Sequence, residues 1–126
     1  MIGRRYAIPS KTAVALERVF EAPVDGIIVI EKSLYARVHP GMSATTRPNR
    51  ILLAISGEEF AANPELLLHE YFHVIRQWRP GHLTRWRYLI ESARRGYRVN
   101  RYELEAREFA ATARARFERY LSALAQ

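Results

Sequence analysis

The segment "PELLLHEYFHVIRQW", residues 64–78, decides how this chain folds. Asn63 and Pro64 form a typical helix start, because asparagine caps free N–H groups and proline fits the first helical position. On a helix with about 100° per residue, one broad side of this segment is apolar. That side holds Leu67, Leu68, Tyr71, Phe72, Val74, Ile75 and Trp78. We therefore predict a helix over 64–78 that buries its apolar side and leaves a narrow polar strip opposite.

The polar strip carries two of the chain's four histidines, His69 and His73, with Glu70 between them. Residues four apart lie one turn apart on one face, so both imidazoles can reach one metal ion. Glu70 is turned slightly aside, where it can accept a proton from water. The chain has no cysteine, so a metal site must use histidine or carboxylate ligands. A plain solvent-exposed face of a helix has a similar composition, and this alternative remains open.

A catalytic zinc site needs a third protein ligand and an open position. The predicted C-terminal helix, from Asn100 as its cap to about Leu124, offers a candidate in Glu103. The apolar stripe of this helix consists of Ala106, Ala110, Ala113, Phe117, Leu121 and Leu124. Glu103 lies at the head of the stripe, whereas Glu105 points about 200° away from it. We expect Glu103 to be the third ligand; Glu105, or an acidic residue that only favours the helix dipole, is the alternative.

Two further helices are predicted. Ser10 is expected to cap a helix from Lys11 to about Glu21, and Thr84 to cap one that ends near Gly96. The order of helix, strands and then helices predicts an α+β domain.

The strands lie between the first helix and the segment 64–78. Three strands are predicted: an apolar run at 27–31, an alternating run at 34–39 and a run at 50–56. A turn is predicted at 39–41. Closely spaced strands of this kind predict a small, mainly antiparallel sheet. The length of 126 residues fits one domain over the whole chain.

The net charge of +7 comes from the C-terminal half, where twelve arginines and five glutamates lie between Arg76 and Arg119. These arginines are scattered singly and form no nucleic-acid motif, so a solvated face is favoured and no nucleic-acid partner is expected. Lys11, Glu17 and Arg18 interrupt any signal-like apolar run at the N-terminus. We expect a cytoplasmic protein without membrane association, and the sequence predicts no oligomeric state.

Two motifs together resemble the gluzincin pattern of zinc metallopeptidases: "HEYFH" at 69–73, followed by "NRYELEAREFA" at 100–110. The part "ELEAREFA" is also similar to the downstream motif of ImmA/IrrE-type metallopeptidases. The wider stretch from about 27 to 113 resembles small bacterial metallopeptidases of the contractile-injection-system core-domain group.

The resemblance implies a compact zincin-like domain, a minimal gluzincin, that hydrolyses peptide bonds in a peptide or protein substrate. It implies Zn²⁺ as cofactor, His69, His73 and Glu103 as ligands, and Glu70 as general base. It also implies that an edge strand of the sheet, within 45–54, pairs with an extended substrate.

The chain departs from this pattern at Arg107, where many relatives carry an acidic residue or asparagine that holds a ligand histidine. The residues that orient the histidines are therefore unassigned. Candidates for transition-state stabiliser are Tyr97, Tyr102 and His82. A rival hypothesis is a zincin-fold binding module without turnover, which holds an acidic partner through its basic surface.

Overall fold

The computed structural model describes residues 3–33, 43–96 and 100–125, and over these it is an α+β arrangement, as predicted. Its strands are β1 (Arg4–Tyr6), β2 (Ile28–Glu31), β3 (Ala44–Arg47) and β4 (Arg50–Leu53). Its helices are α1 (Ser10–Phe20), α3 (Gly57–Ala61), α4 (Pro64–Phe72), the π-helical η1 (His73–Trp78), α5 (Arg85–Arg95) and α6 (Arg101–Ala125).

The sheet has the strand order β1-β2-β4-β3. The sheet is mixed: β1 pairs antiparallel with β2, β2 pairs parallel with β4, and β4 pairs antiparallel with β3. β2 and β4 confirm the strands expected at 27–31 and at the start of 50–56. The residue pattern predicts neither β1 nor β3, because "RRY" and "ATTR" contain no apolar run, although β3 overlaps the range 45–54 in which the resemblance implies an edge strand. The strand expected at 34–39 and the turn at 39–41 lie outside the described residues.

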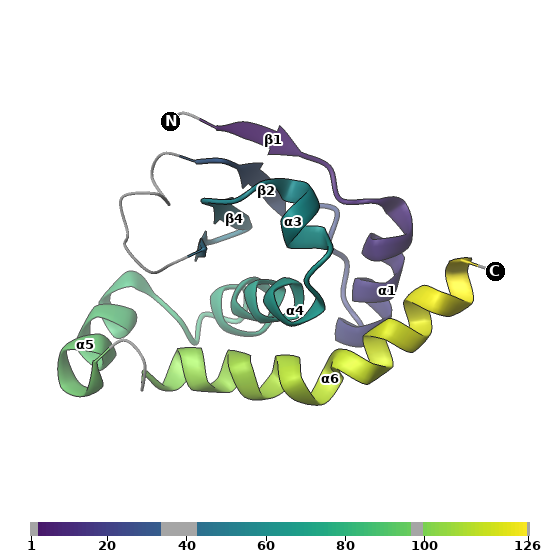
Figure 1. Cartoon of the computed structure of the whole chain (residues 1–126). Helices are drawn as coiled ribbons and strands as arrows, with labels where there is room; N and C mark the ends of the chain where they lie inside the picture. The colour runs from purple at the N-terminus through teal and green to yellow at the C-terminus, as the bar shows by residue number, and fades with distance from the viewer. Residues whose placement is uncertain (1–2, 34–42, 97–99, 126) are drawn as a thin grey trace.

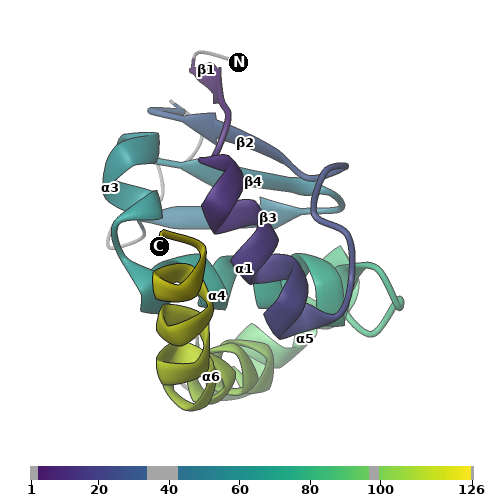
Figure 2. The ribbon, with the colours of Figure 1, turned by 90° about the vertical axis from the view of Figure 1, so that its right-hand side faces the viewer.

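The helix α4 lies between the sheet and α6 (Figures 1 and 2). β3 is the edge strand nearest to α4, and Trp78 of η1 donates a hydrogen bond to the Thr46 hydroxyl of β3 at 3.0 Å. The buried core between these layers includes Leu16, Phe20, Ile51, Leu53, Phe60, Leu67, Leu68, Tyr71, Val74 and Phe117. This packing fixes the axis of α4 and so the direction in which its polar strip faces.

The predicted helix over 64–78 begins as expected, since the Asn63 side chain accepts a hydrogen bond from the Leu66 N–H. From His73 onward it widens into the π-helical turn η1, seen in the Arg79 N–H to Val74 C=O hydrogen bond. The polar strip is not a solvent-exposed face: Glu70, His73 and Gln77 are all buried. The alternative of a plain surface strip is therefore wrong.

The other helix starts were predicted with mixed success. Thr84 caps α5 by accepting from the Arg87 N–H, and the Asn100 side chain accepts from the Tyr102 N–H at the start of α6. Ser10 is not a cap, because α1 already includes it and follows Pro9 without a side-chain cap hydrogen bond.

The long helix α6 buries the stripe that the sequence predicts, including Ala106, Ala110, Ala113 and Phe117. Small alanine side chains let α6 approach its neighbours closely, and arginines occupy much of its outer face. Among the residues that the structure describes, none of the helices has both the length and the apolar character that a membrane crossing requires.

Phe117 is fully buried in the core, so Phe117→Ala should lower the free energy of unfolding by about 3–5 kcal/mol. The exposed Arg119 on the same helix is the matched control, and Arg119→Ala should change stability by less than about 0.5 kcal/mol. Urea denaturation followed by circular dichroism measures both. Equal effects of the two substitutions would contradict the packing of α6 described above.

Candidate metal centre

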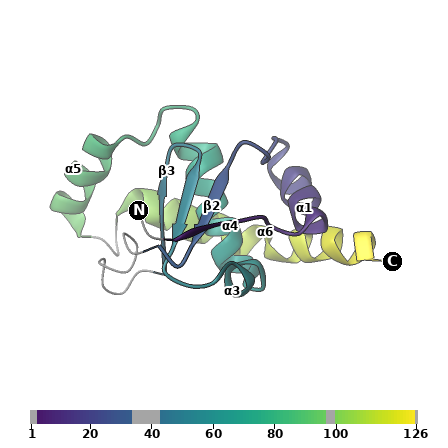
Figure 3. The same cartoon turned by 90° about the horizontal axis from the view of Figure 1, so that it is seen from above.

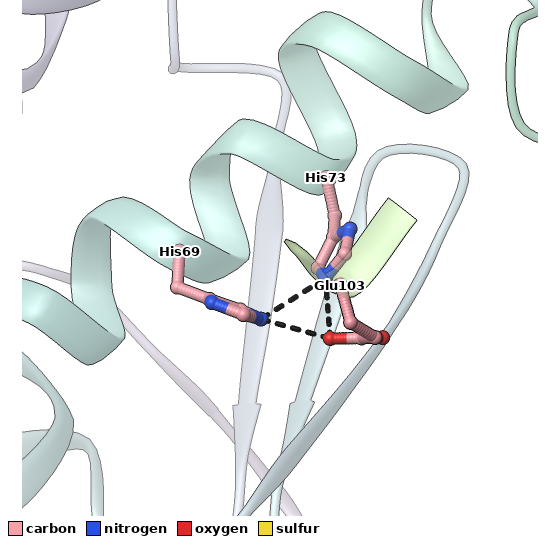
Figure 4. A group of neighbouring side chains, drawn as sticks. All are labelled: His69, His73 and Glu103. Atoms are coloured by element: carbon pink, nitrogen blue, oxygen red, sulfur yellow. Dashed lines mark hydrogen bonds and ion pairs between the residues drawn. The ribbon is translucent and has the colours of Figure 1, made fainter. Parts of the chain in front are cut away.

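Three side chains from α4, η1 and α6 converge on one point between the helices (Figure 4). His69 Nε2 lies 3.0 Å from Glu103 Oε1, and His73 Nε2 lies 3.2 Å from the same oxygen. The two Nε2 atoms are 3.2 Å apart. His73 and Glu103 are buried and His69 is partly buried, so the group forms a His/His/Glu cluster within reach of one metal ion.

The donor set and its spacing fit a zinc ion. In a tetrahedral site with bonds of about 2.0–2.1 Å, ligand atoms lie about 3.3–3.4 Å apart, close to the separations of 3.0 to 3.2 Å found here. Two imidazoles and one carboxylate make up a common set of three protein ligands for zinc, with a fourth position left for water or substrate.

Gln77 fixes the orientation of His73. The Gln77 Nε2 donates to the Tyr102 carbonyl at 3.0 Å and to the Glu105 carboxylate at 2.9 Å, and both partners are acceptors. The amide oxygen must therefore face His73, where it accepts from Nδ1–H at 2.6 Å. With its proton held on Nδ1, a neutral His73 presents the Nε2 lone pair to the centre, as metal binding requires.

Glu103 is held at both carboxylate oxygens. Oε1 faces the two histidines, and Oε2 accepts a hydrogen bond from the Tyr88 hydroxyl of α5 at 3.0 Å. The sequence predicts that Glu103 faces inward and Glu105 outward, and the structure confirms this, with Glu103 buried and Glu105 exposed.

The buried charges shift one another's proton affinities. Burial alone would lower the pKa of His73, but the hydrogen bond and charge of Glu103 outweigh burial and raise this pKa to about 9. Burial would raise the pKa of Glu103, yet hydrogen bonds from His69 and His73 hold it well below its ordinary value. Without metal, His73 and Glu103 therefore form a buried ion pair near neutral pH.

Glu70 lies beside this cluster without belonging to its ligand set. Its carboxylate is buried, with Oε2 3.9 Å from His69 Nε2. Burial raises the pKa of Glu70 above its ordinary value, against the opposing charges of His73 and His69. A carboxylate with a raised pKa next to a metal-ligand cluster has the properties of a general base.

The described contacts do not connect the side chains of His82 and Tyr102, two of the expected transition-state stabilisers, to the His/His/Glu cluster. His82 is exposed in the loop before α5, and the Tyr102 hydroxyl accepts a hydrogen bond from Arg101 at 2.9 Å. Tyr97 lies outside the described residues. Tyr88, which the sequence reasoning missed, reaches the cluster instead, and only the packing of α5 against α6 reveals it.

The orienting residue that the sequence left unassigned is Gln77, four residues after His73. Its position on the polar strip was a usable signal, because residues four apart share a helix face. Arg107, at the position where an orienting group was sought, is exposed on α6.

Comparison of the chain with protein-family models, with curated proteins and with solved structures finds no match.

Replacing Gln77 by leucine removes the acceptor for His73 Nδ1–H, so zinc affinity should fall by about 10–100-fold. Glu105→Gln is the matched control, since its amide oxygen still accepts from the Gln77 amide and affinity should stay within about threefold. Competition titration with a chromophoric chelator measures both affinities. Equal zinc affinity of the Gln77→Leu variant and the unmodified protein would remove the orienting role.

Zinc binding should displace the proton from His73. Because the pKa of His73 is raised from 6.5 to about 9 by folding, its protonated form stabilises the metal-free protein below pH 6.5, and this contribution is lost as pH rises through about 9. Zinc added at pH 7 should therefore release about one proton per chain, and zinc affinity should rise between pH 7 and pH 9. Calorimetry in two buffers of different ionisation enthalpy measures the release. Binding without proton release would contradict the ion pair.

Proposed function

We propose that this protein is a zinc-dependent metallopeptidase. The observation that carries the proposal is the burial of Glu70 beside the converging donor atoms of His69, His73 and Glu103. A site that only stabilises the fold uses four protein ligands and needs no additional buried carboxylate at its edge. The resemblance of 69–73 and 100–110 to the gluzincin motifs supports the same assignment.

His69, His73 and Glu103 would hold the zinc ion. A zinc ion in such a site makes water more acidic and polarises a carbonyl group. Glu70 accepts a proton from the attacking water and passes it to the leaving amine, so its raised pKa suits both steps. Gln77 keeps His73 in the tautomer that leaves Nε2 unprotonated.

The edge strand β3 is the proposed binding site for an extended peptide. Within the part of the chain that the structure describes, it pairs with β4 on one side only, and the alternation of its pairing leaves the backbone groups of Ala44 and Thr46 directed away from β4. The Trp78–Thr46 hydrogen bond ties this strand to the helix segment that carries His73. Arg47 donates to the Thr46 carbonyl at 2.7 Å, so its guanidinium must move when a peptide pairs there.

Tyr88 is our candidate for the group that stabilises the developing oxyanion. Its hydroxyl is the donor that already points at the cluster, through Glu103 Oε2. A Tyr88→Phe variant removes this hydrogen bond and frees one carboxylate oxygen of Glu103. It therefore tests the positioning of Glu103 and the stabilisation of the oxyanion together.

The decisive test combines metal content with cleavage. Protein purified without added metal should contain close to one zinc per chain by elemental mass spectrometry, and Glu103→Ala should lose most of it. Glu70→Gln should keep the zinc and lower cleavage of a defined peptide library by about 10²–10⁴-fold. Glu108→Gln, an exposed carboxylate on α6, is the control and should change neither quantity.

Zinc retained with full cleavage in the Glu70→Gln variant would overturn the role of Glu70. Zinc retained without any cleavage by the unmodified protein would favour the rival binding module. A chain that takes up no zinc at neutral pH would overturn the peptidase hypothesis and leave the binding module, which does not require a metal, as the leading hypothesis.

A further inference from the structure

The helix α5 packs against the start of α6 with its polar side, not its apolar side. Three of its side chains make these contacts: Tyr88 donates to Glu103 at 3.0 Å, Glu91 accepts from the Arg101 N–H at 3.2 Å, and Ser92 accepts from Asn100 at 2.9 Å. Glu91 is buried, and Tyr88 and Ser92 are half-buried. An amphipathic helix of a single globular domain usually buries its apolar side instead.

The apolar side of α5 is left facing outward. Trp86, Leu89 and Ile90 are 76%, 59% and 56% exposed. With the exposed Ala93 they occupy positions i, i+3, i+4 and i+7, which lie on one face of a helix. We call these four residues the α5 stripe. Figures 1 and 3 place α5 at one end of the molecule, opposite α1 and the C-terminal end of α6.

Arginines border the stripe on both sides. At about 100° per residue, Arg87 and Arg94 lie along one side of it and Arg85 along the other, and all three are exposed. The one acidic residue of α5, Glu91, is turned inward toward Arg101. The outward surface of this helix therefore combines large apolar side chains with positive charge and carries no carboxylate.

We propose that α5 is a docking helix for a protein partner that presents an apolar groove bordered by Asp and Glu. The spacing i, i+3, i+4, i+7 is that of helices that insert into such grooves, and tryptophan and arginine are the residues that most often dominate binding energy at interfaces. Arginine pairs with carboxylates through two parallel hydrogen bonds. The same positive charge disfavours a second copy of α5 as the occupant.

This docking surface is independent of the proposed peptidase activity. The helix is already ordered by its contacts with α6, so docking does not require it to fold first. However, Tyr88 of α5 donates a hydrogen bond to Glu103. A partner on the outer face of α5 would therefore contact a helix that is hydrogen-bonded to the candidate metal-binding cluster.

The probe for this proposal is the isolated C-terminal lobe of calmodulin, used only as a defined acidic domain. It opens a groove of apolar side chains with calcium and closes it without calcium. The full chain should bind the calcium-loaded lobe at about 10 μM or tighter in about 0.15 M salt, and should not bind the calcium-free lobe. Isothermal calorimetry measures the dissociation constant.

Leu89→Asp should weaken this binding at least about tenfold, and Arg94→Glu by a similar factor, because one removes an anchor and the other reverses a charge beside the stripe. Val14→Asp on α1 and Arg119→Glu on α6 make the same changes at exposed positions elsewhere and should leave binding within about twofold. Circular dichroism of each variant confirms that it is folded.

The same proteins are titrated with vesicles of phosphatidylcholine and phosphatidylserine. Tighter binding to these vesicles than to the calcium-loaded lobe would overturn the proposal and assign the α5 stripe to an anionic lipid surface. No binding to the lobe, or binding that Leu89→Asp leaves unchanged, would also overturn it. None of these outcomes depends on zinc or on cleavage, so the proposed function stands or falls separately.

Discussion

The structure depends on a buried cluster of ionisable groups, Glu70, His73 and Glu103 with His69 at its edge, held between α4–η1 and α6. Isolated charges in such a place cost several kcal/mol each unless they are paired and hydrogen-bonded. Here a proton on His73 supplies the pairing in the metal-free protein, and the donor set allows a metal ion to replace it. Either cation offsets the charge of Glu103, which would otherwise be buried unpaired between the two helices.

Several local features follow from this constraint. The alanines of α6 allow its backbone to approach α4 closely enough for Glu103 to reach both histidines. The π-helical turn that begins at His73 departs from regular helix geometry at one of the three residues of the candidate metal-binding cluster, and such turns often occur at functional sites. Gln77, within that turn, links His73 to the Tyr102 carbonyl at the start of α6, so the position of the His73 side chain depends on both helices.

The sequence predicts those parts of the site that follow from one helix at a time. His69, Glu70 and His73 follow from spacing, and the inward placement of Glu103 follows from the apolar stripe of its own helix. Gln77 could have been found by the same spacing rule. Tyr88 could not, because its contact with Glu103 depends on how α5 turns against α6, which no periodicity within α5 encodes. The residue pattern also does not predict the short strands β1 and β3, since their pairing partners define them more than their composition does, and only the resemblance points to an edge strand near β3.

The unusual orientation of α5 has its physical reason at the start of α6. The first N–H groups of a helix lack partners within the helix, and a carboxylate near them is favoured by the helix dipole. Glu91 of α5 accepts a hydrogen bond from the Arg101 N–H, and Tyr88 donates one to the carboxylate of Glu103, two residues further along α6. These hydrogen bonds from Tyr88 and Glu91 determine which side of α5 faces inward, so its apolar side faces outward. A chain that retains Trp86 and Leu89 on that outer side exposes an apolar surface of the kind that marks interaction sites, which is why we assign it a partner and not a place in the core.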